Sequence, residues 1–316
     1  DVATIAREAE RVGYEYCFVA DEGLHPDVYA CLAVVARETD SITIGAMTNG
    51  YTRHPAVTAA ALATINELSG GRAAVTVLAG GSMVLGPMGI PRRRPFRVVA
   101  DAMEVMRRLW SGATVTWQGA TTSLHNATLG FGPQAIPIWV ASRGPMLLDH
   151  AGGHADGVVM TVKPDLGAAL AIVDEGAAVS GRPSPKRVYL GRVCYTPEML
   201  EGQRRTLSFV LMDSPARVLG SLGFDEAEVG LVAEAAATNR PDLVDPMVTD
   251  DLLRRYQVAG SPGECADEVA ALVDRHRLDV VMVDALSADL DENLALLHET
   301  YPIISGRTRA DAGAAT

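Results

Sequence analysis

Several features that would assign this chain of 316 residues to a specialised class are missing from it. No apolar run approaches the roughly 20 residues that span a bilayer, and the N-terminus carries no signal-peptide pattern. We therefore expect a cytoplasmic protein without a membrane partner. The four cysteines, Cys17, Cys31, Cys194 and Cys265, are scattered without a CxxC pair. This spacing predicts reduced thiols rather than a disulfide framework or a zinc site.

Positive charge is scarce as well. The formal net charge is −12, and Lys163 and Lys186 are the only lysines. A chain with this balance has no global basic surface for nucleic acid, so we expect no nucleic-acid partner. The histidines show no clustering at metal-ligand spacing, and we predict no metal site. What remains is a chain with 48% hydrophobic and 21% charged residues, which is typical of a compact enzyme.

The main pattern along the chain is an alternation of short β-branched runs with longer amphipathic stretches, which indicates parallel βα units. Strands are expected at residues 16–20, 42–48, 73–78, 138–141, 157–161, 187–194 and 279–284. Helices are expected at residues 2–12, 27–37, 55–68, 96–110, 145–151, 166–180, 262–275 and 290–301. A small hairpin, 114–118 with 121–124, and a helical insertion at 199–257 interrupt the alternation.

This order of elements predicts a (β/α)₈ TIM barrel with the helical insertion after strand seven. The seven expected strands are one fewer than a closed barrel needs. Because the chain opens in a helix without an initiating Met, we expect the first strand to lie upstream of the sequence given. We expect one domain over residues 1–304 and a flexible tail over 305–316. An open doubly wound sheet is the alternative architecture.

Candidate ligand-binding residues gather where strands end and helices begin, because chemistry in a βα barrel takes place at that edge. Thr48 and Asn49 end the second expected strand with hydrogen-bonding side chains, although such residues also serve merely to finish a strand. The turns with glycine permit close approach to a ligand, or are ordinary βα turns; they are Ala79-Gly80-Gly81 and Ser142-Arg143-Gly144-Pro145. The second of these opens a helix, whose N-terminus favours an anion.

Three longer segments carry a resemblance to a known family. IGAMTNGYTRHPAVTAAALATINELSGGRAAV (44–75), LWSGATVTWQG (109–119) and IPIWVASRGPMLLDHAGGHADGVV (136–159) are similar to luciferase-like flavin and deazaflavin proteins. The similarity is closest to the branch around methylenetetrahydromethanopterin reductase, whose members use coenzyme F420. The resemblance implies a barrel that binds a tricyclic redox cofactor, and a homodimer.

The family pattern then assigns roles to residues of this chain. It implies that Ala46, Met47, Thr48 and Asn49 contact the cofactor ring, together with Ala79, Gly80 and Gly81. Ser142, Arg143, Gly144 and Pro145 are implied to bind the cofactor phosphate. Val162 and Lys163 follow the fifth expected strand toward the same edge, where Lys163 is a candidate for an anion contact. Arg92, Arg93 and Arg94 are candidates for the acidic tail of F420, or are solvated.

A pair of carboxyl residues, Asp21 and Glu22, is the first candidate for proton transfer. Many relatives have a histidine at the place of Glu22, and the closest branch has a carboxylate where this chain has Gly81. These departures suggest that Glu22 has taken over the proton role in a dry pocket, with His25 as the fallback. Both carboxyls could equally be solvated loop residues.

The leading hypothesis is an F420-dependent oxidoreductase that moves hydride between C5 of the deazaflavin and a small organic substrate. The alternative is an FMN-dependent monooxygenase, which would need a separate flavin reductase as partner. A third possibility, from another class, is a flavin-binding protein without catalysis.

The resemblance also predicts a non-prolyl cis peptide bond between Ala46 and Met47. In this superfamily such a bond often ends the third barrel strand and presses against the cofactor ring. The alternative without a functional role is a regular strand end with Met47 in the core. A cis bond there costs roughly 3–4 kcal/mol, so the fold keeps one only where surrounding structure enforces it.

Overall fold

The computed structural model describes residues 1–238 and 240–306. The chain divides into two compact units, which are described separately. The first unit contains Asp1–Ala141, Ala155–Gly157 and Ser287–Leu297, and the second contains Ser142–His154, Val158–Leu286 and the chain from His298 onward. Among the described residues, no helix combines the length and the apolar character needed to cross a membrane.

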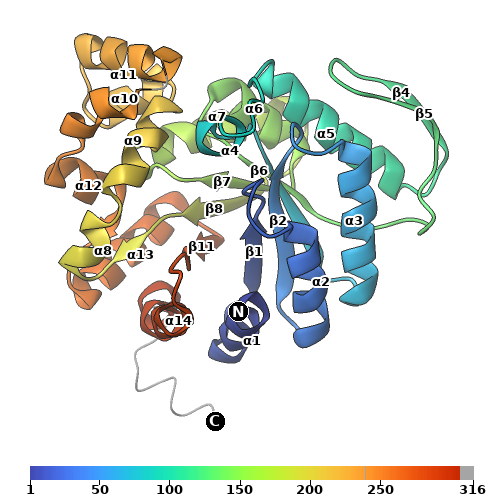
Figure 1. The fold of residues 1–316 in the computed structure, drawn as a ribbon, viewed down its shortest axis with the longest axis horizontal. Helices are drawn as coiled ribbons and strands as arrows, with labels where there is room; N and C mark the ends of the chain where they lie inside the picture. Colours follow the sequence, from blue (N-terminus) through green and yellow to red (C-terminus); the bar gives the residue numbers. More distant parts are fainter. Residues whose placement is uncertain (239, 307–316) are drawn as a thin grey trace. The chain divides into compact units, whose positions relative to one another are not determined.

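The first unit alternates strands and helices (Figure 1). Its elements are α1 (Val2–Val12), β1 (Tyr16–Ala20), α2 (Val28–Glu38), β2 (Thr43–Asn49), α3 (Pro55–Leu68), β3 (Ala73–Leu78), α4 (Ser82–Leu85), α5 (Pro95–Trp110), β4 (Val115–Gln118), β5 (Ser123–Ala127) and β6 (Ile138–Ala141). The strand order is β1-β2-β3-β6 with parallel pairing throughout. Strands β4 and β5 form a separate antiparallel hairpin.

The second unit holds the remaining strands and the insertion. Its elements are α6 (Pro145–His154), β7 (Gly157–Met160), η1 (Lys163–Asp165), α7 (Leu166–Val179), β8 (Lys186–Leu190), β9 (Val193–Cys194), α8 (Pro197–Glu201), α9 (Arg204–Met212), α10 (Ala216–Ser221), α11 (Glu226–Thr238), η2 (Pro241–Leu243), η3 (Asp245–Met247), α12 (Asp250–Tyr256), β10 (Val258–Ala259), α13 (Pro262–His276), β11 (Val280–Met282) and α14 (Leu290–Ser305). The first residue of β7 and the start of α14 belong to the first unit. The main strands follow the order β7-β8-β11.

The helices begin where the sequence provides caps. The Asp27 side chain accepts hydrogen bonds from the backbone N–H groups of Tyr29 and Ala30 at the start of α2. His54 caps α3 through Nδ1, with Pro55 in the first turn. Such caps satisfy N–H groups that have no partner within the helix. They fix where each helix leaves the preceding strand end.

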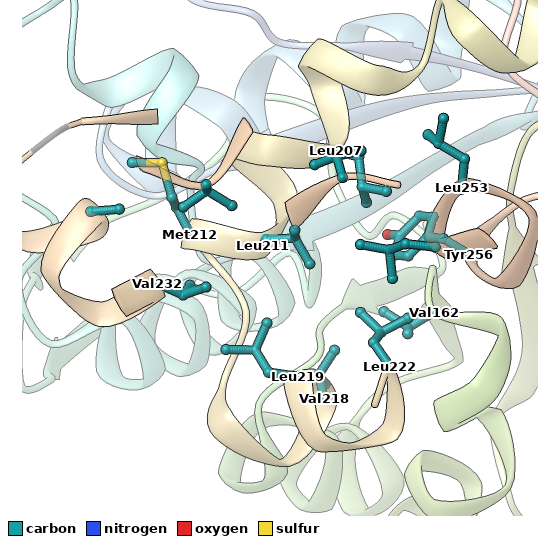
Figure 2. Close-up of a cluster of buried hydrophobic side chains, with 14 of the residues drawn as sticks. Val162, Leu207, Leu211, Met212, Val218, Leu219, Leu222, Val232, Leu253 and Tyr256 are labelled. Atoms are coloured by element: carbon teal, nitrogen blue, oxygen red, sulfur yellow. The ribbon is translucent and has the colours of Figure 1, made fainter. Parts of the chain in front are cut away.

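The insertion, residues 199–257, is helical as predicted and has a core of its own. Figure 2 shows buried side chains of α9, α10, α11 and α12 packed together, with Leu207, Leu211, Val218 and Leu253 at most 2% exposed. Val162, which follows β7, belongs to the same cluster. The insertion is therefore a packed subdomain rather than a loose loop.

The sequence placed nearly all of these elements correctly, and three details differ. The expected strand 187–194 splits into β8 and β9, with Gly191 and Arg192 between them. Strand β9 pairs instead with β10, which the sequence did not predict. Helix α14 continues to Ser305, past the expected helix end at 301, and residues 307–316 of the expected tail lie outside the described residues.

A carboxylate anchors the N-terminal helix α1 to the start of β2. Glu10 accepts hydrogen bonds from the backbone N–H groups of Asp40, Ser41 and Ile42 and from the Ser41 hydroxyl. Burial raises the pKa of Glu10, but these four donors outweigh it and hold the pKa at about 2. The ionised carboxylate is thus the form that the folded chain favours.

Replacing Glu10 with glutamine is expected to lower the free energy of unfolding by about 1–2 kcal/mol at neutral pH, since charge-assisted hydrogen bonds are lost. The folded pKa of about 2 lies below the ordinary 4.5. The contribution of Glu10 is therefore complete above pH 4.5 and disappears as the pH falls toward 2. Urea unfolding of both proteins between pH 7 and pH 3 should show the two stabilities converging. A constant difference across this range would contradict the assignment.

Candidate cofactor site

The carboxyl ends of β1, β2, β3 and β6 present a row of side chains on one face of the first unit. Parallel register pairs Ala20 with Met47, Met47 with Thr76, and Thr76 with Trp139. Because paired residues on neighbouring strands point to the same side, these four form one row, here called the inner face. The alternate residues, such as Thr48 and Val77, face helices α3 and α5 instead, where they line a small cavity.

The inner face is smooth and partly open at its carboxyl end. Ala20 is exposed, and Met47 is half-buried. One step farther along the strands, Leu78 and Ala141 are half-buried neighbours. Small and unbranched side chains at the edge of a parallel sheet provide an apolar surface against which a planar ring system can lie.

Aromatic rings close the other end of this face. The Phe18 and Trp139 rings are stacked with centroids 5.1 Å apart. Two glycines make room for them: a Cβ at Gly45 would lie 2.4 Å from the Phe18 ring, and a Cβ at Gly157 would lie 2.7 Å from the Trp139 ring. Packed rings leave only the carboxyl-end half of the inner face open to a ligand.

Asp21 is the carboxylate that the fold holds in place at this edge. Its backbone N–H donates to the Met47 carbonyl at 2.8 Å, continuing the β1–β2 ladder past the strand end. Its carboxylate accepts a hydrogen bond from the Thr48 hydroxyl at 2.9 Å. The Tyr29 hydroxyl in turn donates to the Thr48 oxygen at 3.4 Å. Asp21 is half-buried and therefore has a fixed position.

The other two proton-transfer candidates are placed differently. Glu22 and His25 lie on the loop between β1 and α2, and both are exposed. The dry pocket that the sequence suggested around Glu22 is not formed by this loop. Of the three candidates, Asp21 alone combines partial burial with a side-chain hydrogen bond to a strand end.

Tyr29 was not among the residues singled out from the sequence. It lies in the first turn of α2, and its burial raises the pKa of its hydroxyl. The Arg53 guanidinium lies 4.5 Å from the centre of the Tyr29 ring and forms a 2.6 Å ion pair with Asp27. The sequence signal that could have identified Tyr29 is the helix cap Asp27, because the cap fixes the first turn of α2, which contains Tyr29. Arg53 therefore braces this edge of the first unit.

Thr48 and Asn49 are buried, and their oxygens bond within the chain. The Asn49 side-chain oxygen accepts hydrogen bonds from the backbone N–H groups of Tyr51 and Thr52. This arrangement fixes the loop between β2 and α3. Both residues therefore have a structural role at the end of β2, in addition to any contact with a ligand.

The predicted cis bond between Ala46 and Met47 is wrong, because every described peptide bond is trans. Strand β2 keeps regular pairing with β1 on one side and with β3 on the other through both residues. An uninterrupted parallel ladder on both sides requires an extended trans backbone. Ala46 faces the helices and is fully buried, while Met47 remains on the inner face.

The turn Ala79-Gly80-Gly81 is covered rather than bare. Gly80 has φ +72°, and a Cβ there would lie 2.7 Å from the Leu85 side chain. The Gly81 carbonyl accepts the backbone N–H of Leu85 as α4 begins. Arg92 donates to the Ala79 carbonyl at 3.1 Å, so this arginine ties the following loop to the turn.

In the second unit, the turn Ser142-Arg143-Gly144-Pro145 opens α6. The Gly144 N–H donates to the Ser142 hydroxyl at 3.0 Å, and the Gly144 carbonyl accepts the N–H of Leu148. A Cβ at Gly144 would have only the Ser142 oxygen near it, at 3.9 Å. The Gly144 carbonyl also accepts the N–H of Leu147 at 3.2 Å, and the N-terminus of the helix carries partial positive charge.

Val162 and Lys163 are both engaged inside the second unit. The Val162 side chain is 3% exposed and packs in the insertion core. The Lys163 ammonium donates to the carbonyls of Arg254 and Gln257 and forms an ion pair with Glu268 at 2.5 Å. With three acceptors around it, Lys163 joins the turn after β7 to α12 and α13.

No group of three or more His, Cys, Asp or Glu side chains in the described part of the chain could hold a metal ion. The described cysteines are free thiols, and burial raises the pKa of Cys17 and of Cys194 to about 11. The raised pKa keeps the Cys17 and Cys194 thiols protonated at neutral pH, so neither is a ready nucleophile.

Comparison with known proteins assigns the chain to a family. The family model described as luciferase-like monooxygenase matches residues 1–277. The chain belongs to this luciferase-like family, as the sequence motifs indicated. The 5,10-methylenetetrahydromethanopterin reductase of Archaeoglobus fulgidus is 30% identical over 304 residues, covering 92% of this chain and 91% of that protein. An F420-dependent glucose-6-phosphate dehydrogenase of Intrasporangium calvum is 27% identical, covering 84% and 83%.

Solved structures agree on the fold. The coenzyme F420 dependent tetrahydromethanopterin reductase of Methanopyrus kandleri superposes with a TM-score of 0.82 at 24% identity, covering 97% of this chain and 95% of that chain. A monooxygenase of Streptomyces bottropensis gives 0.69 at 18% identity, covering 96% and 92%. The expected class, a parallel α/β fold of the luciferase-like TIM-barrel type, is confirmed, and the doubly wound alternative is set aside.

Proposed function

We propose that this protein is an F420-dependent oxidoreductase that transfers hydride between the deazaflavin and a small organic substrate. The observation that carries the proposal is similarity over nine-tenths of the chain to a reductase of the methylenetetrahydromethanopterin group. A second group of relatives carries F420 dependence in its name. Likeness to monooxygenases is more distant, at 18% identity.

Each unit, taken by itself, has a feature that suits one part of such a cofactor. The open half of the inner face, with Ala20, Met47 and Leu78, is apolar and suits a planar tricycle. The first turn of α6, beginning at Pro145, suits a phosphate through the partial positive charge of a helix N-terminus. When bound, F420 supplies the carbon centre that accepts or donates hydride. The protein supplies orientation and excludes water from the reacting edge.

Asp21 is our first candidate for moving or holding a proton next to that edge. The Thr48 hydroxyl donates to Oδ2 of Asp21, and the Gly23 N–H donates to Oδ1 at 3.4 Å. Glu22 and His25 are the second candidates, because they follow on the same loop. A positioned carboxylate within hydrogen-bond reach of its substrate is the usual geometry for general acid–base catalysis.

A bulky residue in place of Gly144 should weaken cofactor binding without unfolding the chain. A leucine side chain would extend into the space in front of the α6 N-terminus, and its Cβ meets nothing closer than 3.9 Å. We expect a loss of roughly 2 kcal/mol in binding, the scale of one or two charge-assisted hydrogen bonds. Fluorescence titration with F420 measures the change, and Gly144→Ala is the matched control. Equal F420 affinities for the wild type, the leucine variant and the alanine variant would show that the cofactor phosphate does not bind at this turn.

An FMN-dependent monooxygenase is the second candidate function, since the family model carries that description. It would require a partner flavin reductase, and reduced FMN with the protein would consume oxygen. A flavin-binding protein without catalysis would bind cofactor and show neither activity. Oxygen uptake with reduced FMN above the rate of reduced FMN alone, compared with anaerobic oxidation of reduced F420 by an organic hydride acceptor, separates the three.

We also propose a cytoplasmic homodimer. Val34 on α2 and Val57 on α3 are each 52% exposed, and these neighbouring helices flank β2. These two side chains are the residues that we choose to test as part of a dimer interface. Light scattering of the wild type and of a Val34→Glu, Val57→Glu double variant measures the mass of the particle.

A further inference from the structure

The Arg217 side chain links the insertion to both turns that follow β6 and β7. Arg217 lies on α10, and its guanidinium forms an ion pair with the Asp165 carboxylate, at the junction of η1 and α7. A second guanidinium nitrogen donates to the Arg143 carbonyl at 2.9 Å. One arginine of the insertion therefore contacts the turn before α6 and the turn before α7 at the same time.

The bond to the Arg143 carbonyl fixes one peptide unit at both ends. The carbonyl of Arg143 and the N–H of Gly144 belong to the same planar group. Arg217 holds the carbonyl, and the Ser142 hydroxyl accepts the N–H at 3.0 Å. With this peptide fixed, the backbone that enters α6 at Pro145 has one conformation.

Burial makes this contact costly to lose. The Asp165 side chain is only 4% exposed, and burial raises its pKa while Arg217 opposes that rise. Removing Arg217 would leave a buried carboxylate without its ion-pair partner. The Arg143 guanidinium also points into the insertion, where it donates to the Val210 carbonyl at 2.8 Å and to the Ser214 hydroxyl at 2.9 Å.

We propose that Arg217 is a positioning residue for cofactor binding: from the insertion, it sets the direction of the Arg143–Gly144 peptide at the phosphate turn. Through its α10 helix, the insertion then controls the anion-binding geometry at the start of α6. This inference rests on the proposed function for its ligand, and on the described contacts of the second unit for its geometry.

The test uses the full-length protein and three variants. Arg217→Met removes both contacts, and Arg205→Met on the exposed side of α9 is the matched control. The double variant Arg217→Met, Asp165→Asn removes the unpaired buried charge as well. Each protein is titrated with F420, unfolded with urea, and followed by amide hydrogen exchange in peptides that contain Gly144.

Arg217→Met should raise the F420 dissociation constant about tenfold or more, the effect of one hydrogen bond to a charged group. It should also accelerate exchange at Gly144, while Arg205→Met changes neither. The double variant should recover stability but not F420 affinity, because only the carboxylate has been neutralised. Wild-type affinity in the double variant, or unchanged exchange at Gly144 in Arg217→Met, would overturn the proposal. Faster exchange in a protein whose wild type binds neither F420 nor FMN would reject the proposed function and leave the positioning of the peptide standing.

Discussion

Asp21→Asn is expected to lower kcat about a hundredfold or more while F420 affinity changes little. The asparagine side chain keeps the size of aspartate and can still accept a hydrogen bond from Thr48, but it cannot take up a proton. General acid–base catalysis by a positioned side chain contributes typically 10²–10⁴-fold. Single-turnover oxidation of reduced F420, together with a binding titration, separates the chemical step from affinity.

The adjacent Glu22→Gln variant is the matched control, since Glu22 is an exposed carboxyl on the same loop. Thr48→Val removes the hydroxyl that holds Asp21 at 2.9 Å and should lower kcat by a smaller factor. If Glu22→Gln loses activity and Asp21→Asn does not, the proton role belongs to Glu22. If neither loses activity, His25 is the next residue to test.

Gly176→Ala is expected to destabilise the second unit by about 3 kcal/mol or more, because overpacking here meets backbone rather than a side chain that can move. A Cβ at Gly176 on α7 would lie 2.1 Å from the Asp149 carbonyl oxygen on α6. Across the same contact, a Cβ at Gly152 would lie 2.0 Å from the Val173 carbonyl oxygen. The two helices therefore touch backbone to backbone, and this contact seats the helix that begins at the phosphate turn.

Gly167→Ala, in the same helix, provides the control. A Cβ at Gly167 would meet only the His276 ring at 3.6 Å, which is an ordinary contact. Alanine in a helix is favoured over glycine by up to about 1 kcal/mol, so this variant should be slightly more stable than the wild type. Urea unfolding of both variants gives the two free energies. Similar stabilities for Gly176→Ala and Gly167→Ala would contradict the close packing of α6 on α7.

The fold was predictable because its signals are local. Pro55 and the cap at His54 mark the start of α3, and hydrophobic periodicity carries it to Leu68. The split of the strand at Gly191 was not predictable in the same way. Apolar residues stand on both sides of the break, Leu190 before it and Val193 after it, so the local pattern does not mark it.

The candidate site was only partly predictable. The sequence places Asp21 and Thr48 at the ends of two neighbouring strands, and in the structure the Thr48 hydroxyl lies 2.9 Å from the Asp21 carboxylate. Asp21 and Glu22 could not be distinguished from the sequence. They are adjacent carboxyl residues, and only the conformation of the loop decides that Asp21 is half-buried and Glu22 exposed. Lys163 was expected to face a ligand, whereas Glu268, more than one hundred positions away, holds its ammonium. Long-range partners of this kind leave no mark in the local pattern.

The central claim is that this protein uses F420, and the most direct measurement is a pair of binding titrations with F420 and FMN under identical conditions, read by cofactor fluorescence. We expect saturable F420 binding that is at least about tenfold tighter than FMN binding. Gly144→Leu should weaken F420 binding, and Gly144→Ala should leave it nearly unchanged. Tighter binding of FMN, or no saturable binding of F420 to the folded protein, would contradict it.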